Sequence, residues 1–423
     1  MRRGLSLKPF CLLAVFAWAG AGGCAFGPKA IQKTHGMYAE SVRQVEEEQL
    51  LRHIIHLRYN ETALNLDITS IAAQYEASAS VEARPFFVAP NPGSNAFRTF
   101  TSILPDLSIS GSNRPTITYA PLNDGTSVRR YLTPITLETL VLLTQTSWPV
   151  SSVLRLWVER INGVPNAVTA SGPQRAVIPD YARFRQAAEL LQTAQDRELA
   201  SVRTEERVVE TSASFAAESV TPAVALEASK AGLEYRPDAD GKRSTLVRRD
   251  RRLYVEVSSG AENSPELLEL SSLLNLVPRK NRYDVMLASR GSPDPMKFPS
   301  PPEDTFRIVP RSTAQVLFYL SNGIEVPAEH ICAGLVPQSL GADGQPFDPR
   351  TITDGLFAVH VCKGRKQPPN AHIAVNYRGF WYYIDDADRD SKATFALVLQ
   401  LSRLDFARQS IGSSPTLTLP VGR

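Results

Sequence analysis

The chain lacks the sequence motifs of several common enzyme classes. Its 423 residues include no GxSxG nucleophile elbow, no GxxxxGK phosphate loop, no GxGxxG dinucleotide fingerprint and no HExxH zinc motif. Serine-hydrolase, P-loop, dinucleotide-binding and zinc-metalloprotease sites therefore have no local support. A catalytic triad assembled from distant residues leaves no such string, so the absence weighs only against the classes that carry a motif.

The chain also has a small net charge and few long apolar runs. The formal charge of +3 comes from Arg2, Arg3 and Lys8, and it leaves 43 basic and 43 acidic residues from position 24 onward. A neutral chain lacks the cationic field of a nucleic-acid binder, so we expect no nucleic-acid partner. No apolar run after the first 23 residues approaches the roughly 20 residues of a membrane helix, so any membrane attachment is expected at the N-terminus.

The first 23 residues have the pattern of a secretory signal peptide. A positive segment precedes an apolar stretch from Phe10 to Trp18, and small residues then lead to Cys24. Residues 21–24, Ala-Gly-Gly-Cys, resemble the lipobox of bacterial lipoproteins, in which a peptidase cuts before a cysteine that carries diacylglycerol. The resemblance implies an acyl anchor, such as palmitate, on Cys24. Because Ala25 follows, it also implies the outer membrane facing the periplasm. The alternative is cleavage after Ala21, which would give a soluble periplasmic or secreted protein.

Few cysteines remain once Cys11 is removed with the leader and Cys24 is assigned to lipid. Cys332 and Cys362 are then a candidate disulfide, because the envelope outside the inner membrane is oxidising. Two unconnected buried thiols are the first alternative. The second is a weak zinc site, because both cysteines stand in a His-x-Cys tripeptide with His330 or His360. We otherwise expect no metal and no cofactor.

Three other clusters have ordinary structural explanations. His53 and His56 share one helical face, for which a solvated surface is the favoured interpretation and a weak metal site the alternative. The aspartates of residues 386–390 lack the Gly and Glu of a calcium loop and favour helix capping. The aromatic residues 380–383 favour sheet packing over a carbohydrate groove.

Hydrophobic periodicity predicts an α+β fold with mixed helices, a partly antiparallel sheet and an amphipathic N-terminal helix at residues 31–59. A helix capped by Thr133, with Pro134 at its first position, is expected next, and another is expected to run from Val150 to Gly163. A strand is expected to start near residue 64, where Leu64, Leu66 and Ile68 alternate with polar residues, and a hairpin turn is expected at Arg378–Gly379. Loops with short strands are expected over residues 78–115, and a proline-rich loop over 288–304. The predicted organisation is a signal peptide (1–23), a helix-rich α+β region (24–210), a linker or irregular region (211–249), a C-terminal α+β domain (250–408) and a tail (409–423).

Four segments resemble stretches of a group of uncharacterised bacterial envelope proteins. They are LRY, ING, RS…YLSNGIEVP and WYYIDD…SK, at residues 57–59, 161–163, 311–327 and 381–392. The resemblance implies one folded unit and brings no activity with it. The leading hypothesis is a lipid-anchored, non-enzymatic binding or assembly component of the envelope, with envelope proteins as partners. The alternatives are an envelope hydrolase or metal-dependent enzyme, and a carbohydrate-binding module.

Overall fold

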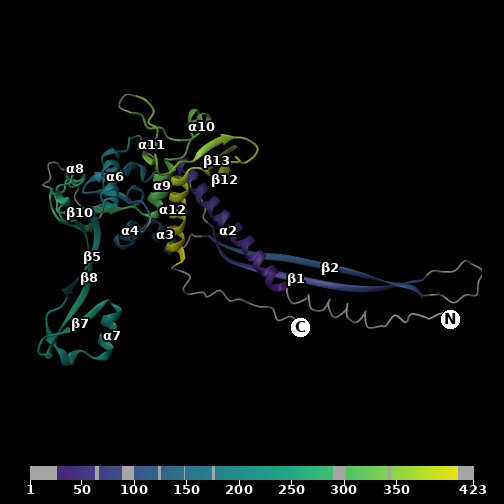
Figure 1. Cartoon of the computed structure of the whole chain (residues 1–423), viewed down its shortest axis with the longest axis horizontal. Coiled ribbons are helices and arrows are strands. Elements are labelled where there is room, and N and C mark those ends of the chain that lie inside the picture. The colour runs from purple at the N-terminus through teal and green to yellow at the C-terminus, as the bar shows by residue number, and fades with distance from the viewer. Residues whose placement is uncertain are drawn as a thin grey trace, which may run out of the picture. The chain divides into compact units, whose positions relative to one another are not determined.

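The computed structural model describes residues 26–61, 66–87, 100–121, 125–146, 148–173, 177–288, 302–341 and 344–407 (Figure 1). The predicted signal peptide, Cys24 and the predicted tail at 409–423 lie outside these residues. The chain divides into two units. One comprises Met1–Ala63 with Arg129–Phe406, and the other Leu64–Val128 with Ala407–Arg423. The predicted α+β class is confirmed, with helices and sheets both present.

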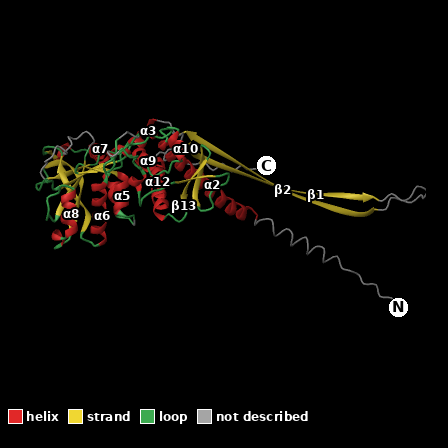
Figure 2. Ribbon diagram, turned by 90° about the horizontal axis from the view of Figure 1, so that it is seen from above, coloured by secondary structure: helices red, strands yellow, loops and turns green. Residues whose placement is uncertain are grey.

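The second unit contains a two-stranded ribbon. Strand β1 (Leu66–Phe87) pairs antiparallel with β2 (Phe100–Pro121) over almost the whole of both strands, as Figure 2 shows. The strand expected to start near residue 64 is confirmed. The loops with short strands expected over 78–115 are wrong, because most of this segment belongs to one long strand pair whose register no short-range pattern defines.

The first unit begins with helix α2 (Phe26–Arg58), which confirms the predicted N-terminal helix. Its C-terminal turns enter the core, where Leu51, Ile54 and Ile55 are fully buried at helical spacing. Most described side chains between Gly36 and Val45 are exposed. Within the described residues, no helix is both long enough and apolar enough to cross a membrane.

The next two helices begin after Thr136 and Pro149, and the predicted start at Val150 is confirmed, whereas the other predicted start and the predicted end at Gly163 are wrong. Helix α4 (Leu137–Thr144) begins after Thr136, whose hydroxyl accepts the Thr139 N–H, so the cap expected at Thr133 is three residues early. Helix α5 (Val150–Trp157) follows Pro149, and the chain then becomes strand β3 instead of continuing to Gly163. The neighbouring elements are α3 (Gly125–Leu132), β3 (Val158–Ile161), β4 (Val164–Pro165) and α6 (Ala182–Asp196).

A mixed sheet is formed by strands that lie between residues 158 and 310. Its strand order is β4-β3-β10-β9-β8-β5, with β6 and β7 also paired to β8, and only β9 and β10 run parallel. The new elements are β5 (Ala200–Glu210), β6 (Phe215–Ala216), α7 (Pro222–Lys230), β7 (Leu233–Pro237), β8 (Arg243–Val257), α8 (Pro265–Leu273), β9 (Arg282–Leu287) and β10 (Thr305–Pro310).

The strand pairing does not follow the predicted domain limits. The limit at residue 250 lies inside β8, and β3 of the predicted N-terminal region pairs with β10 of the predicted C-terminal domain. The predicted linker at 211–249 contains β6, α7, β7 and the first half of β8. Long-range pairing therefore makes one sheet from three predicted regions.

The C-terminal part adds a small antiparallel sheet and its covering helices. Sheet order is β11-β13-β12, and the predicted Arg378–Gly379 hairpin turn is confirmed, with both residues at positive φ. Its elements are α9 (Thr313–Ser321), α10 (Ala328–Cys332), α11 (Arg350–Thr353), β11 (His360–Lys363), β12 (Ala371–Tyr377), β13 (Phe380–Asp385) and α12 (Arg389–Ala407). One continuous core spans both sheets of this unit, with Trp157, Tyr319 and Tyr382 among its largest buried side chains.

Candidate functional site

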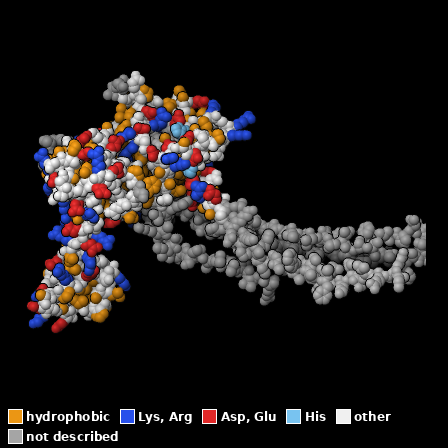
Figure 3. Space-filling model, viewed as in Figure 1, with side chains coloured by type: hydrophobic (Ala, Val, Ile, Leu, Met, Phe, Trp, Pro, Cys, Tyr) orange, Lys and Arg blue, Asp and Glu red, His pale blue; other side chains and the backbone are white. Residues whose placement is uncertain are grey.

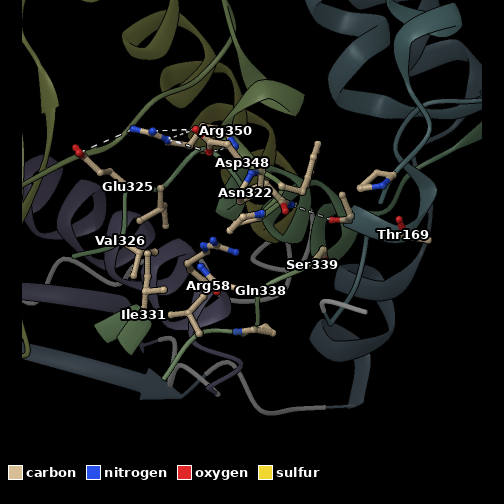
Figure 4. A pocket seen from close by; sticks show the side chains of 18 of the residues that line it. Arg58, Thr169, Asn322, Glu325, Val326, Ile331, Gln338, Ser339, Asp348 and Arg350 are labelled. Atoms are coloured by element: carbon tan, nitrogen blue, oxygen red, sulfur yellow. Dashed lines mark hydrogen bonds and ion pairs between the residues drawn. The ribbon is translucent and has the colours of Figure 1, made fainter. Parts of the chain in front are cut away.

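A pocket of about 260 Å³ opens at the C-terminal end of α2 (Figure 4). Its walls come from distant parts of the first unit: the last residue of α2, the turn after α9, helix α10 and the loop that leads to α11. Apolar side chains form much of the wall, among them Ile324, Val326, Ile331 and Phe347. A few polar and charged groups among apolar walls are typical of sites that orient a small ligand.

Arg58 is the unusual member of this lining. It exposes 6% of its surface, and its Nε and Nη1 atoms are buried with no hydrogen-bond partner among the described residues. Burial lowers the pKa of its guanidinium to about 10, and the Asp348 carboxylate opposes that shift from a distance. A buried charge without a direct partner destabilises a fold, so its presence beside a pocket needs an explanation.

The other charged groups of the pocket are occupied by one another. Arg350 donates from Nε and Nη2 to the Asp348 carboxylate at 3.1 and 2.8 Å, and these bonds are the main reason that the pKa of Asp348 is lowered. Glu325 accepts the Val361 N–H at 3.2 Å, and one of its oxygens lies 3.9 Å from Arg350 Nη1. Figure 4 draws the contacts of Arg350 with both acids as dashed lines. The pocket lining thus contains two guanidinium groups. That of Arg350 is paired with carboxylates, whereas the Nε and Nη1 atoms of Arg58 have no hydrogen-bond partner among the described residues.

Arg311 shows how this fold satisfies a buried arginine. It is fully buried, and its guanidinium donates to the Ser171 hydroxyl and to the carbonyls of Arg155, Leu156 and Asn166. The guanidinium also lies 4.2 Å from the centre of the Tyr319 ring. These contacts join α5, α9 and the segment that follows β4. Arg311 is therefore a structural residue. Arg58 is also buried, but its Nε and Nη1 atoms lack hydrogen-bond partners among the described residues.

The residue after Arg58 fixes the end of α2. The Tyr59 hydroxyl lies 2.7 Å from His330 Nδ1 and 2.6 Å from the Tyr382 hydroxyl. Burial raises the pKa values of both tyrosines and lowers that of His330, which keeps all three groups neutral near pH 7. Nearby, Glu61 accepts one hydrogen bond from the Tyr377 hydroxyl, at 2.7 Å. These bonds hold α2 against α10 and the small sheet, and thereby position Arg58.

The structure does not assemble the predicted zinc site. His330 and Cys332 lie on α10, which is helical, so a two-residue spacing does not place them on one face. His360 and Cys362 lie on β11. Across the residues that the structure covers, no three His, Cys, Asp or Glu side chains gather to hold a metal ion.

The predicted disulfide is not formed in this structure. Cys332 and Cys362 are both free, the first exposed and the second half-buried. The alternative of two buried thiols does not hold either, because Cys332 ends a short helix at the surface. Cys24, the predicted lipid site, is outside the described residues.

The histidines of α2 are not on a solvated face, which corrects the favoured interpretation. His53 is buried, with Nε2 3.3 Å from the Tyr131 hydroxyl. The ring of His56 is half-buried, and its Nδ1 lies 2.8 Å from Glu61. Both are packed because α2 contacts α9 and β12 through this part of its length.

Two other expectations are confirmed. Asp388 caps the start of α12, since its Oδ1 accepts the Ser391 N–H at 3.0 Å. The aromatic run of β13 packs the sheet, with Phe380 and Tyr382 buried and Trp381 and Tyr383 half-buried on the other face. The exposed aromatic face that a carbohydrate-binding module requires is absent from this described strand.

Arg58 was not among the residues predicted to be functional, although its sequence context contains one signal of burial. Residues 51, 54, 55 and 58 share one helical face, and the first three are apolar core residues. An arginine at the fourth position of such a face is expected to be buried, because the helix cannot turn it to solvent without exposing the others. Helical spacing does not predict which groups would hydrogen-bond to Arg58, because such groups come from residues distant in the sequence.

The interpretation of the site rests on its geometry, because the comparisons with known proteins found no match. No protein-family model, no curated protein and no solved structure matches the chain. Residues 57–59, 161–163, 311–327 and 381–392 all lie in the first unit. Two of them supply pocket residues, namely Arg58 from the first segment and Asn322, Ile324, Glu325 and Val326 from the third.

Proposed function

We propose that the chain is a lipid-anchored protein of the bacterial cell envelope that binds a small ligand without transforming it. The observation that carries the proposal is the pocket at the end of α2, in which a buried guanidinium faces a cavity with both apolar and polar walls. Such a site has one strong group for orientation and apolar walls for contact.

The long helix α2 suits a tethered protein. Phe26, its first described residue, is two positions after Cys24. At 1.5 Å per residue, the stretch from Phe26 to Val45 is about 30 Å long. With acyl chains on Cys24, this stretch would act as a spacer between the bilayer and the pocket.

The surface is consistent with a neutral binding protein. Figure 3 shows basic and acidic side chains interspersed over the described part of the face that it draws. Many of the exposed charges are paired across strands, as Arg249 is with Glu234 and Arg282 with Glu205. Such a surface favours a small ligand or a protein partner over nucleic acid.

Native mass spectrometry of the protein extracted in mild detergent tests the binding function. We expect a small-molecule adduct on the wild-type chain. Gln338→Trp should abolish it, because Gln338 is exposed at the pocket wall and an indole there obstructs the cavity. Leu340→Trp is the matched control, because Leu340 is exposed two residues further on and does not line the pocket. An adduct that survives Gln338→Trp would place binding elsewhere.

A further inference from the structure

We propose that the pocket at the end of α2 binds a small carboxylic acid with an apolar body, and that Arg58 receives its carboxylate. This inference rests on the binding function proposed above and names the chemical class of the ligand. It follows from three properties of the pocket: the unengaged guanidinium, the apolar walls and the size.

The guanidinium requires hydrogen-bond acceptors that the protein does not supply. Arginine has five N–H donors, and across the described parts of the chain Arg58 forms no hydrogen bond and no ion pair. Asp348 is close enough to influence Arg58 electrostatically, but its carboxylate is engaged by Arg350. In Figure 4 the Arg58 side chain extends from α2 toward the centre of the labelled lining residues. A ligand oxygen is therefore the missing acceptor.

A negatively charged acceptor suits this position best. Hydrogen bonds between a guanidinium and a carboxylate or phosphate are about twice as strong as neutral ones, and they can form in pairs. Because Arg58 is 6% exposed, water screens the attraction only weakly. The bound anion also offsets the destabilisation that the unpaired charge causes in the empty protein.

The surroundings favour a carboxylate over a phosphate. Asp348 and Glu325 already bring two negative charges to the lining, so a doubly charged phosphate would meet more repulsion than a singly charged carboxylate. Beside the polar side chains of Thr169, Asn322, Gln338 and Ser339, the remaining walls contain aliphatic side chains, including Ile324, Val326 and Ile331. The aliphatic side chains contact the apolar body of an organic acid, a contact that a compact inorganic ion does not make.

The volume limits the ligand to a small molecule. At about 260 Å³ the pocket is near the lower end of ligand sites, which range from about 300 to 1,000 Å³. A short aliphatic or single-ring acid is of suitable size. Hexanoate is therefore a reasonable probe, because it combines one carboxylate with a short apolar chain.

Titration calorimetry on the full chain in a non-ionic detergent tests the inference. Hexanoate should bind the wild-type protein, and Arg58→Gln should weaken binding by about 10- to 100-fold, as expected for the loss of a charged hydrogen-bond pair. Arg52→Gln is the matched control, since it removes the same charge from an exposed position on the same helix. 1-Hexanol, which keeps the chain without the charge, should bind less tightly than hexanoate to the wild-type protein.

A second readout separates a ligand-binding role from a structural one. In the absence of ligand, Arg58→Gln should raise the thermal midpoint, because it removes an unpaired buried charge. A lower midpoint would assign Arg58 a structural role and overturn the inference. Equal hexanoate affinity in wild type and Arg58→Gln would overturn it as well, and so would binding of inorganic phosphate without binding of hexanoate.

The two proposals fail in different ways. If native mass spectrometry shows an adduct that Gln338→Trp abolishes and Arg58→Gln retains, the binding function stands and the carboxylate assignment fails. If the wild-type chain shows no adduct and binds neither hexanoate nor phosphate, both fail. If the adduct is an acid whose mass is lost in both variants, both are supported.

Discussion

Replacement of Arg58 by Met is expected to stabilise the protein in the absence of ligand. Burial lowers the pKa of Arg58 from 12.5 to about 10, and each pKa unit corresponds to about 1.4 kcal/mol. Because arginine stays protonated at pH 7, the folded state carries a penalty of about 3 kcal/mol there. The unfolded chain holds this proton more tightly than the folded one, so the penalty is full below pH 10 and declines only as the pH rises toward 12.5. Methionine removes the charge and keeps most of the aliphatic volume.

Urea unfolding followed by tryptophan fluorescence measures this change. Trp157 is fully buried and Trp381 half-buried in the first unit, so their emission reports on the fold around the pocket. With a denaturant slope of about 2–3 kcal/mol per molar urea, a gain of about 3 kcal/mol raises the midpoint by about 1 M. Arg52→Met, an exposed control, should stay within about 0.5 kcal/mol of wild type. A midpoint for Arg58→Met below the wild-type value would refute the reasoning, because it would mean that the buried charge is compensated.

Four further changes have expected outcomes. Arg311→Met should lower the free energy of unfolding by about 3–5 kcal/mol and so lower the urea midpoint, opposite in sign to Arg58→Met, because it leaves buried carbonyls without donors; an unchanged midpoint would contradict this. Gly323→Ala should cost about 1–3 kcal/mol in the same assay, since a Cβ there would lie 2.6 Å from Thr353 Oγ1. Stability should fall as the pH drops below 6.5, because burial lowers the pKa of His330 and the unfolded chain takes up this proton first; His330→Gln should flatten that dependence. Cys24→Ser should move the protein from the membrane pellet to the soluble fraction, and full retention in the pellet would exclude the anchor.

The sequence predicted those elements whose signals are local. The apolar spacing at the end of α2 and the Arg378–Gly379 turn between β12 and β13 are properties of a few consecutive residues, and both are present in the structure. Strand β3 was missed because Val158–Ile161 suits the inner face of a helix or a strand equally well. Its partner β10 lies about 150 residues further along the chain and decides between the two.

The candidate site shows the same limit at the level of single side chains. Arg58 and Arg311 are both arginines next to apolar residues, and nothing in their immediate sequence separates them. They differ because β4, α5 and their loops bring acceptors to Arg311, whereas the elements around Arg58 bring a charge pair that is already satisfied. The repeated His-x-Cys pattern failed for a related reason, since one copy is helical and the other is a strand.

Tyr59 makes the pocket a preorganised site. Its hydroxyl is held between His330 and Tyr382, and these two residues belong to elements that follow α2 by about 270 and 320 residues. Arg58 precedes Tyr59, and the pocket residue Ile331 follows His330, so the same bonds fix both walls before any ligand arrives. A fixed guanidinium loses little conformational freedom on binding, which leaves more of the attraction as affinity. The folded protein thus keeps a destabilising charge in a rigid position where a ligand carboxylate can neutralise it, and ligand binding should therefore raise the stability of this unit.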